Sequence, residues 1–576
     1  MNQLNKHITV FGLLISIVFS AQAQDEKDQN TDSDTLSTES VIVIKTFNPT
    51  INDAFKIPSK PNFDDKEATV KPNLDYQINS VPVASTFVPD KTTSVEVKKE
   101  KPVSQFGNYA LLGVGNFLNV NAEFFSAIEI DRHSQFSVLL EHLSSQGGID
   151  DVELDDNFSD TGLQLTYSKQ SKRLEWSTDL ELQHQLYNWY GIPEDLQISR
   201  ADLVSIDPSH SFIDVNAGAQ FYIRNTNFKS AKVRFRHFRD DFDSSENNIV
   251  IQPEFAISFD GIDFKIPVTL DFLQGTFEGN SFQPESKYSI LNAGVSPSIA
   301  IQLQGINVQV GVTGYVSNDS ENSDLNLHAY PNITASYEVP QYNLSLFGGL
   351  KGDLIQNTYH NAASENVFTA PLLGITPTSQ VFNFFAGAKG SLSANFGYEA
   401  KASFGLENDK PLWLKNVDLG ESTTEIFAFG QSNSFIYVYD DVTVGKLDFK
   451  LNYDVENNYG LSLNGVFATY GVDEQSEAWN LPSIQGSIQG HYFVTKKIKA
   501  STGLYFTGSR KDINQIVGET VDVDGYFDAN VRLDYKVNKQ WQAFVLGNNL
   551  TGQNYEQWQD FRVQGLQFML GAKYQF

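Results

Sequence analysis

The chain has 576 residues, a formal net charge of −29 at pH 7 and no cysteine. Without cysteine it has no disulfide, no catalytic thiol and no cysteine that could carry a lipid anchor. Nucleic-acid phosphates need Lys and Arg to neutralise them, so the acidic balance argues against a nucleic-acid partner.

The first residues read as a secretory signal peptide. The stretch "MNQLNKHITVFGLLISIVFSAQAQ" has a polar start with Lys6, an apolar run and an Ala-Gln-Ala sequence before Gln24. This pattern predicts a signal peptide over residues 1–23, cut after Ala23. A membrane anchor is the weaker alternative, because the run falls short of the ~20 apolar residues of a membrane helix. No later segment reaches that length, so the chain can enter a membrane only as strands.

Residues 24–105 differ from the rest of the chain. They begin with the acidic stretch "QDEKDQNTDSDTLSTES" and continue as short apolar pieces interrupted by proline. Such a composition predicts an extended or disordered periplasmic segment. A plain tether is the favoured interpretation. The alternative is that the apolar run Val41–Ile44 adds a strand to a sheet edge of another protein.

From residue 106 to residue 576 the pattern is strand after strand, with apolar residues at every second position. In Tyr526–Val537, for example, Phe527, Leu533 and Tyr535 fall on one face, while charged residues fall on the other. The candidate strands run from 9 to 17 residues, longer than the usual 5–6 of a soluble sheet. Tilted strands that cross a bilayer need about 9–11 residues.

The loops between the candidate strands alternate in length. Short connections such as "RHS", "QSKR" and "KKI" alternate with long ones such as "SQGGIDDVELDDN" and "GVDEQSEAWN". Short turns on one side and long loops on the other are typical of outer-membrane barrels. Lipid does not tolerate an open sheet edge, so the strands must close. We therefore predict an all-β fold: a closed antiparallel transmembrane β-barrel of about 22 strands in the bacterial outer membrane.

The C-terminal part of the chain also resembles a known family. The sequence "FDANVRLDYKVNKQWQAFVLGNNLTGQNYEQW…LQFMLGAKYQF" is similar to the last three strands of TonB-dependent outer-membrane receptors. Asn549, Leu550, Thr551 and Tyr555 match the family's signature in its penultimate strand. The stretches "GVGNFLNVNAEFF", "EHLSSQGGI", "IYVYDDV" and "EAWNLP" resemble a Bacteroidetes group of such barrels. The resemblance implies a 22-stranded barrel and solute uptake.

The sequence departs from this family before the first strand. The classical receptors carry a plug domain of well over a hundred residues, whereas the segment here is shorter and interrupted by proline. "ESVIVI" (Glu39–Ile44) is loosely like the box that contacts TonB. The resemblance thus implies TonB, or another periplasmic protein, as a partner through residues 39–100, without a conventional plug.

Two candidate strands carry charge on the face opposite their apolar residues. Strand 209–224 lies between them and adds Asp214, Gln220 and Arg224 to that face. If the apolar face meets lipid, a basic ladder in the lumen can guide anionic solutes. The favoured alternative is that acidic and basic ladders neutralise each other. The ladder residues are Glu175, Asp179 and Glu181 on strand 173–189, and Lys232, Arg234 and Arg236 on strand 230–240.

An acidic outer loop and the last residue complete the candidate sites. The loop over 150–160 includes Asp150, Asp151, Asp155 and Asp156. Carboxylates can bind Ca²⁺, but the spacing of a calcium loop is missing, so a solvated acidic loop is favoured. The nine histidines show no metal-ligand spacing, and His142 lies in a strand near an outer loop, where an interface residue is expected. Phe576 resembles the terminal aromatic that the barrel-assembly machinery reads.

No motif of catalysis or cofactor binding stands out. The chain has no G-x-S-x-G sequence, no phosphate-binding Gly loop and no Ser–His spacing typical of a hydrolase. We therefore expect no enzyme, no cofactor and no bound metal. Two functions remain: solute uptake, with the long loops at 190–208, 354–379 and 408–440 facing the ligand, or a non-transporting barrel subunit of an outer-membrane assembly or secretion complex. Outer-membrane lipid and lipopolysaccharide are expected partners.

Overall fold

The computed structural model describes residues 107–576, apart from 194–195, 197, 199–202, 260–261, 279–283 and 418–427. The expected signal peptide (1–23) and the N-terminal segment (24–105) therefore lie outside the described residues. Within the described part of the chain, no helix is long and apolar enough to cross a membrane.

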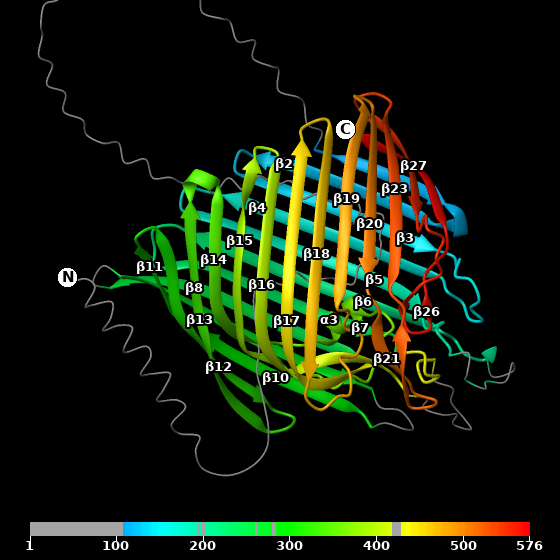
Figure 1. The fold of residues 1–576 in the computed structure, drawn as a ribbon, viewed down its shortest axis with the longest axis horizontal. Helices are drawn as coiled ribbons and strands as arrows, with labels where there is room; N and C mark the ends of the chain where they lie inside the picture. The colour runs from blue at the N-terminus through cyan, green and yellow to red at the C-terminus, as the bar shows by residue number, and fades with distance from the viewer. Residues whose placement is uncertain are drawn as a thin grey trace, which may run out of the picture.

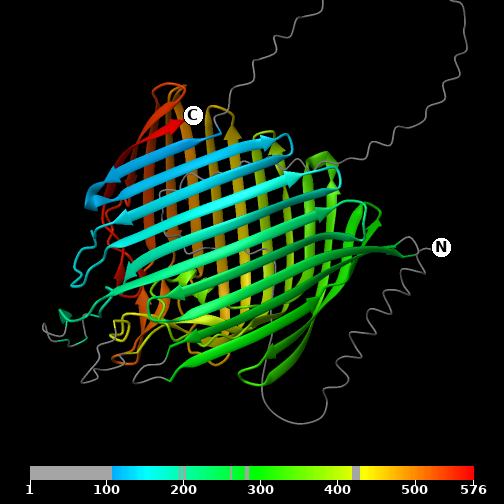
Figure 2. The same cartoon turned by 180° about the vertical axis from the view of Figure 1, so that it is seen from behind.

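A single antiparallel sheet forms nearly the whole structure (Figures 1 and 2). Its strands are β1 (Tyr109–Gly115), β2 (Val120–Asp131), β3 (Ser134–Ser145), β4 (Phe158–Gln170), β5 (Leu174–Asn188), β6 (Ser209–Ile223), β7 (Phe228–Asp240), β8 (Ser245–Phe259), β9 (Ile262–Phe277), β10 (Ser286–Val295), β11 (Ser298–Leu303), β12 (Ile306–Asp319), β13 (Asp324–Val339), β14 (Leu344–Ile355), β15 (Thr378–Ser393), β16 (Phe396–Lys415), β17 (Phe435–Val455), β18 (Tyr459–Val472), β19 (Ile484–Thr495), β20 (Ile498–Thr507), β23 (Tyr526–Lys536), β24 (Trp541–Asn548) and β27 (Gln567–Gln575).

Smaller elements lie in the connections. They are the helix α3 (Tyr359–Glu365), the hairpin of β21 (Arg510–Asn514) and β22 (Glu519–Val523), the hairpin of β25 (Glu556–Trp558) and β26 (Phe561–Arg562), and two 3₁₀ turns, Asn116–Leu118 and Pro340–Tyr342.

The sheet closes on itself through its first and last strands. β27 pairs antiparallel with β1, with Gln575 opposite Tyr109 and Met569 opposite Gly115. The sheet has 23 segments, but β10 and β11 both pair with β9 and β12, so they are two halves of one strand. The break falls at Pro297, which has no backbone N–H to give to the ladder. The predicted closed barrel of 22 antiparallel strands is confirmed.

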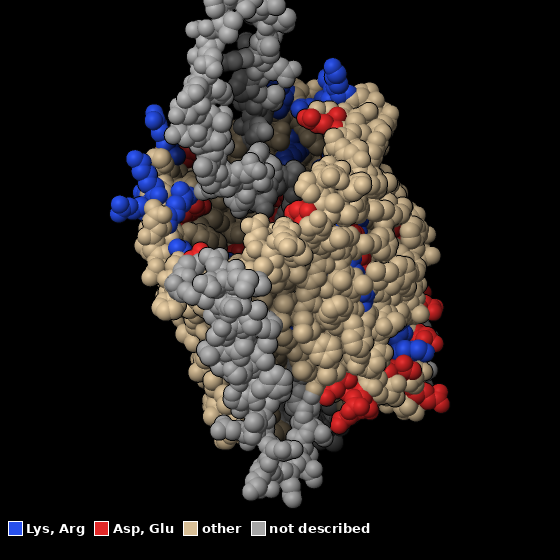
Figure 3. Space-filling view, turned by 60° about the vertical axis from the view of Figure 1, so that its left-hand side comes forward, with Lys and Arg blue, Asp and Glu red and all other residues tan. Residues whose placement is uncertain are grey.

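The outer wall of the barrel is apolar. On the closing strand, Phe568 and Leu570 are 51% and 62% exposed, whereas their neighbour Met569 is buried on the lumen side. Leu533 and Tyr535 of β23 likewise face outward, as the alternating pattern predicts. Figure 3 shows the wall without charge over most of its height, with Lys, Arg, Asp and Glu gathered mainly toward the two ends. This wall is suited to lipid.

Several lumen-facing aromatic rings occupy the space above glycines of the next strand. The ring of Phe544 covers Gly571, and a Cβ added at Gly571 would collide with it. Tyr288 covers Gly275 in the same way. Glycine is needed at these positions because the ring occupies the space of a side chain, a device that supports curved sheets.

The two ends of the barrel differ in the length of their connections. Turns such as 171–173 and 496–497 are short, and the chain ends beside them at Phe576 (Figure 1). The opposite end carries the long loops, α3 and both small hairpins. By the rule for outer-membrane barrels, the short turns face the periplasm and the long loops face outside. We call these the inner end and the outer end.

One predicted loop boundary is wrong. Residues 408–440 were expected to form a long loop, but β16 continues to Lys415 and β17 begins at Phe435. A bulge between Glu407 and Lys410 absorbs Asn408 and Asp409, which read as strand breakers. A bulge accommodates such residues by leaving one of them unpaired, so that the ladder resumes beyond it.

Candidate functional site: the lumen and its outer cap

The loop between β14 and β15 folds into the barrel. We call residues 356–377 the outer cap. It contains α3, whose first turn is held by the side chain of Thr358, which accepts a hydrogen bond from the Asn361 N–H at 3.0 Å. A seven-residue helix is too short to be stable alone. The cap therefore depends on its contacts with the barrel wall.

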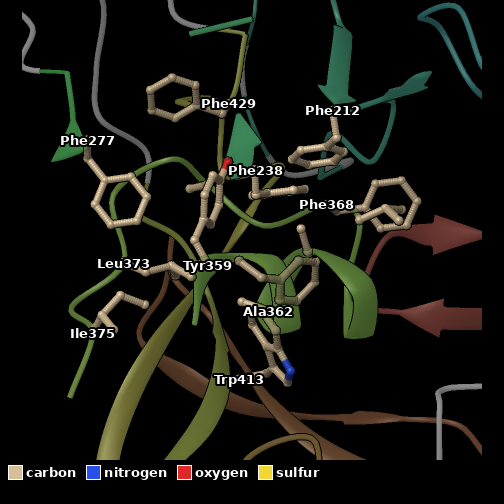
Figure 4. Close-up of a cluster of buried hydrophobic side chains, with 14 of the residues drawn as sticks. Phe212, Phe238, Phe277, Tyr359, Ala362, Phe368, Leu373, Ile375, Trp413 and Phe429 are labelled. Carbon is tan, nitrogen blue, oxygen red and sulfur yellow. The ribbon is translucent and has the colours of Figure 1, made fainter. Parts of the chain in front are cut away.

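Aromatic side chains pack the cap against the wall of β6 to β10 (Figure 4). The Tyr359 ring lies edge-on to Phe238 of β7 and Phe277 of β9, with centroids 5.1 and 5.0 Å apart. Tyr359 and Ala362 are fully buried. The outer part of the lumen therefore holds a true hydrophobic core, made by the cap and the strands together.

Two buried carboxylates fix the cap to the same wall. Glu246 of β8 accepts hydrogen bonds from the backbone N–H groups of Tyr359 and His360, at 2.6 and 3.1 Å, and from the Tyr288 hydroxyl at 2.8 Å. Asp240 of β7 accepts the Tyr359 hydroxyl at 2.7 Å. Burial, followed by the charge of Asp240, raises the pKa of Tyr359, which keeps its hydroxyl protonated as a donor. Glu246 thus satisfies two free N–H groups at the start of α3, and Asp240 holds the Tyr359 side chain beside them.

The far end of the cap binds the opposite wall. The Ala370 N–H donates to the Phe435 carbonyl of β17 at 2.8 Å, and the Phe435 N–H donates to the Phe368 carbonyl at 3.0 Å. The Tyr439 hydroxyl donates to the Gly374 carbonyl at 2.7 Å. Since β7 and β17 are nine strand positions apart in a 22-stranded ring, the cap crosses the lumen from one side to the other.

Three further outer loops pack around the cap. The Phe561 ring stacks on Phe368 with centroids 3.8 Å apart. The side-chain amide of Asn433 donates to the Trp189 carbonyl at 2.8 Å. Near these loops, buried Lys415 forms an ion pair with Asp560. These contacts join residues from four loops into one packed outer end.

The lumen charges found in the sequence meet across β5, β6 and β7. Asp179 pairs with Arg234 at 3.2 Å, and Glu175 pairs with Arg224 at 3.5 Å. Glu181 accepts hydrogen bonds from the Asn216 amide at 2.7 Å and from the Gln164 amide at 3.1 Å. Lys232 is exposed and has no carboxylate within 4.0 Å among the residues that the structure describes. Most of the ladder is thus paired with groups on an adjacent strand or on the next strand but one.

The outermost rung of this ladder touches the cap. Arg236 pairs with Asp214 at 3.2 Å and donates to Nδ1 of His360 in α3 at 3.0 Å. Nε2 of His360 lies 3.6 Å from Asp214. The lumen charges and the cap are therefore one connected network, a link that the sequence did not predict.

The acidic outer loop forms hydrogen bonds and an ion pair within itself and with a neighbouring outer loop. Asp156 accepts the Ile149 N–H at 2.7 Å, and burial raises its pKa. Asp150 accepts the Asn554 amide at 3.2 Å, and Asp151 lies 3.7 Å from Arg562. In the part of the chain that is described, Asp155 has no basic side chain within 4.0 Å. Among the described residues, no group of three or more His, Asp or Glu side chains could hold a metal ion.

Phe576 lies on the outer wall at the inner end, where it is 44% exposed. Its N–H donates to the Asn108 carbonyl at 3.1 Å, next to the start of β1. Its ring stacks on Tyr574 with centroids 5.7 Å apart and approaches Phe124 at 6.5 Å. The last residue therefore packs across the seam that closes the barrel.

Comparison with known proteins shows the fold. No protein-family model matches the sequence, and no curated protein sequence matches it. The iron transporter FrpB from Neisseria meningitidis matches with a TM-score of 0.61 at 8% identity, over 82% of this chain and 82% of that chain. The siderophore receptor PirA from Acinetobacter baumannii matches with a TM-score of 0.59 at 12% identity, over 83% and 81%. The ferric-catecholate import receptor Fiu from Escherichia coli K12 gives 0.58 at 12% identity, over 83% and 82%.

These likenesses concern the fold, because the identities are low. The described chain is a closed 22-stranded barrel with an apolar outer wall, and it shares its architecture with outer-membrane receptors. It is a β-barrel of the bacterial outer membrane with a receptor-like fold.

Proposed function

We propose that the protein takes up a solute across the outer membrane as a receptor-like barrel whose lumen is closed by its own outer cap. The observation that carries the proposal is the cap, which crosses the lumen and is held by side chains of both walls. The fold shared with siderophore and iron receptors supports uptake, and it makes a ferric chelate the first solute to test.

The apolar side chains that the cap buries oppose its spontaneous opening. Moving it away from the wall exposes Tyr359, Phe368, Leu373 and Ile375, all of which are buried. At about 2 kcal/mol for each side chain, exposure costs roughly 8 kcal/mol. Since each 1.4 kcal/mol is a factor of ten, fewer than about one molecule in a hundred thousand is open. A transporter of this design needs a ligand or a partner protein to open it.

Radioactive iron uptake tests the proposal. Iron-limited cells of the source organism that carry or lack the gene are given ⁵⁵Fe bound to a panel of siderophores. We expect the deletion to abolish uptake of one chelate and plasmid-borne protein to restore it. Equal uptake of every chelate by both strains would contradict the proposal that the protein is an iron receptor.

A second function is favoured by the same cap. A lumen closed by a buried hydrophobic core also suits a barrel that never transports and serves as a subunit of an outer-membrane assembly or secretion complex. Stoichiometric co-purification with periplasmic or outer-membrane proteins would support this alternative. Pull-down of the native full chain therefore accompanies the uptake experiment.

The N-terminal part belongs to the proposal as well. A signal peptide over residues 1–23 exports the chain, and the segment 24–105 stays on the periplasmic side, where residues 39–100 contact TonB or another periplasmic protein. Phe576 is proposed as the signal for the barrel-assembly machinery. The proposal also includes that the barrel is of the Bacteroidetes type and has no conventional plug domain. The receptor-like fold supports a protein without enzymatic activity.

A further inference from the structure

A belt of nitrogen donors lies on the lipid-facing wall near the outer end. It consists of His142 on β3, His184 on β5, and His237 and Arg239 on β7. We call these four residues the histidine belt. His142 lies three residues before the outer end of β3, His184 four before that of β5, and His237 three before that of β7. The cross-strand register puts His142, His184 and Arg239 in one row on alternate strands, and His237 lies two residues closer to the inner end.

The belt faces outward. Two residues closer to the inner end, on the same face of each strand, are Leu140, Leu182 and Phe235, which are exposed on the apolar wall at 44%, 39% and 40%. The cross-strand register places Thr161 between His142 and His184, and Thr161 is on this outward face as well. The histidine belt thus marks the boundary of the apolar band toward the outer end, where lipid headgroups meet the protein.

The side chains beside the belt are neutral. Nδ1 of His142 is 2.8 Å from the Thr161 hydroxyl and its Nε2 is 3.1 Å from the Ser144 hydroxyl, which a phosphate oxygen would replace as partner. Nδ1 of His237 is 3.0 Å from the Asn247 amide oxygen. The register continues the belt through Ile213 to Arg239, and from Arg239 to Ser245. Among the described residues, none of these cross-strand neighbours is a carboxylate. Asp241 lies in the loop beyond the strand ends, where it accepts the Ser211 N–H at 3.0 Å.

We propose that the histidine belt binds the phosphate groups of an anionic outer-leaflet glycolipid of the lipopolysaccharide type. Imidazole and guanidinium N–H groups donate hydrogen bonds to phosphate oxygens, and the arginine fork does so in bidentate fashion. Strands lie about 4.8 Å apart, so belt members on alternate strands are about 10 Å apart. That spacing lets separate donors serve separate phosphates of one headgroup while its acyl chains lie on Leu140, Leu182 and Phe235.

The test uses the full-length protein in detergent and bis-phosphorylated lipid A as the probe. Binding is measured by native mass spectrometry and by the rise in the temperature at which the folded band is lost on gels. In H142Q/H184Q/H237Q/R239Q we expect affinity for lipid A to fall at least about tenfold, because four phosphate donors are shortened or lose their charge. Wild-type protein given dephosphorylated lipid A should behave like this variant.

Matched controls separate the belt from general effects. The control variant is H491Q/K265Q. His491 is a lumen-facing ring near Asp454, and Lys265 lies at the inner end, where it pairs with Glu254. This variant should bind lipid A within about twofold of wild type. If the fourfold variant fails to fold, H142Q/H184Q and H237Q/R239Q are measured separately, and each should lose about threefold. Unchanged affinity for lipid A in the belt variants would show that the four residues bind no phosphate, and it would overturn the proposal. Equal protection by inorganic phosphate alone would overturn the assignment to a lipid.

Discussion

At the scale of single residues, Glu246 is the side chain on which the outer cap most depends. It is 1% exposed and accepts three hydrogen bonds, two of them from the start of α3. A buried N–H that loses its acceptor costs about 1–3 kcal/mol. Two such groups therefore add about 2–6 kcal/mol to the roughly 8 kcal/mol that apolar burial contributes to cap closure. The carboxylate is a stronger determinant of closure than any single aromatic contact.

The first prediction concerns this residue. E246A should leave the barrel folded and weaken closure of the cap by about 2–5 kcal/mol, because the Tyr359 and His360 N–H groups lose their acceptor. Hydrogen exchange of residues 359–365 measures this directly and should speed up by at least about tenfold. E254Q is the control, on the same strand near the inner end, where Glu254 lies 3.6 Å from Lys265. Unchanged exchange in E246A would contradict the assigned role of Glu246.

At the scale of secondary-structure elements, the closing strand can be tested through its last residue. Deleting Phe576 removes the N–H bond to Asn108 and the ring contacts with Tyr574 and Phe124. We expect less folded barrel in the outer membrane, both because the assembly signal is lost and because the seam with β1 is weakened. Heat-modifiable mobility of membrane fractions measures the yield. F576Y should keep near-normal assembly, whereas normal yield after deletion would refute the prediction.

The same scale shows what sequence can predict. Strands and lumen charges follow from alternation, because partners such as Asp179 and Arg234 belong to adjacent or nearly adjacent strands. The position of the cap does not follow from alternation, because Glu246 and Tyr359 are 113 residues apart and no local pattern joins them. The sequence predicted a ligand-facing loop at 354–379, and nothing in its composition says which way a loop folds. Its only local signal is Thr358 at the start of a short helical stretch.

At the scale of the whole molecule, the structure combines a wide ring with a closed outer end. A 22-stranded ring encloses far more space than the side chains of its wall can fill. The described turns of the inner end are short, so among the described residues it is the outer loops that cross the lumen. Within the described part of the chain, the cap and the loops packed on it are therefore the barrier to passage through the barrel.

This control is testable by removing the cap. Ile355 and Thr378 are paired at the outer ends of β14 and β15, so a short Gly-Ser linker can replace residues 358–376 without straining the barrel. Wild-type protein in planar bilayers should be silent for most of the recording, because the cap opens in fewer than about one molecule in a hundred thousand. The excised variant should conduct ions in discrete steps. Replacing the exposed residues Ile516 and Val517 at the tip of the β21–β22 hairpin by serine should leave the bilayer silent. A silent excised variant that still runs as a folded barrel on gels would show that the cap is not the barrier, and the cap-gated uptake proposal would fall with it.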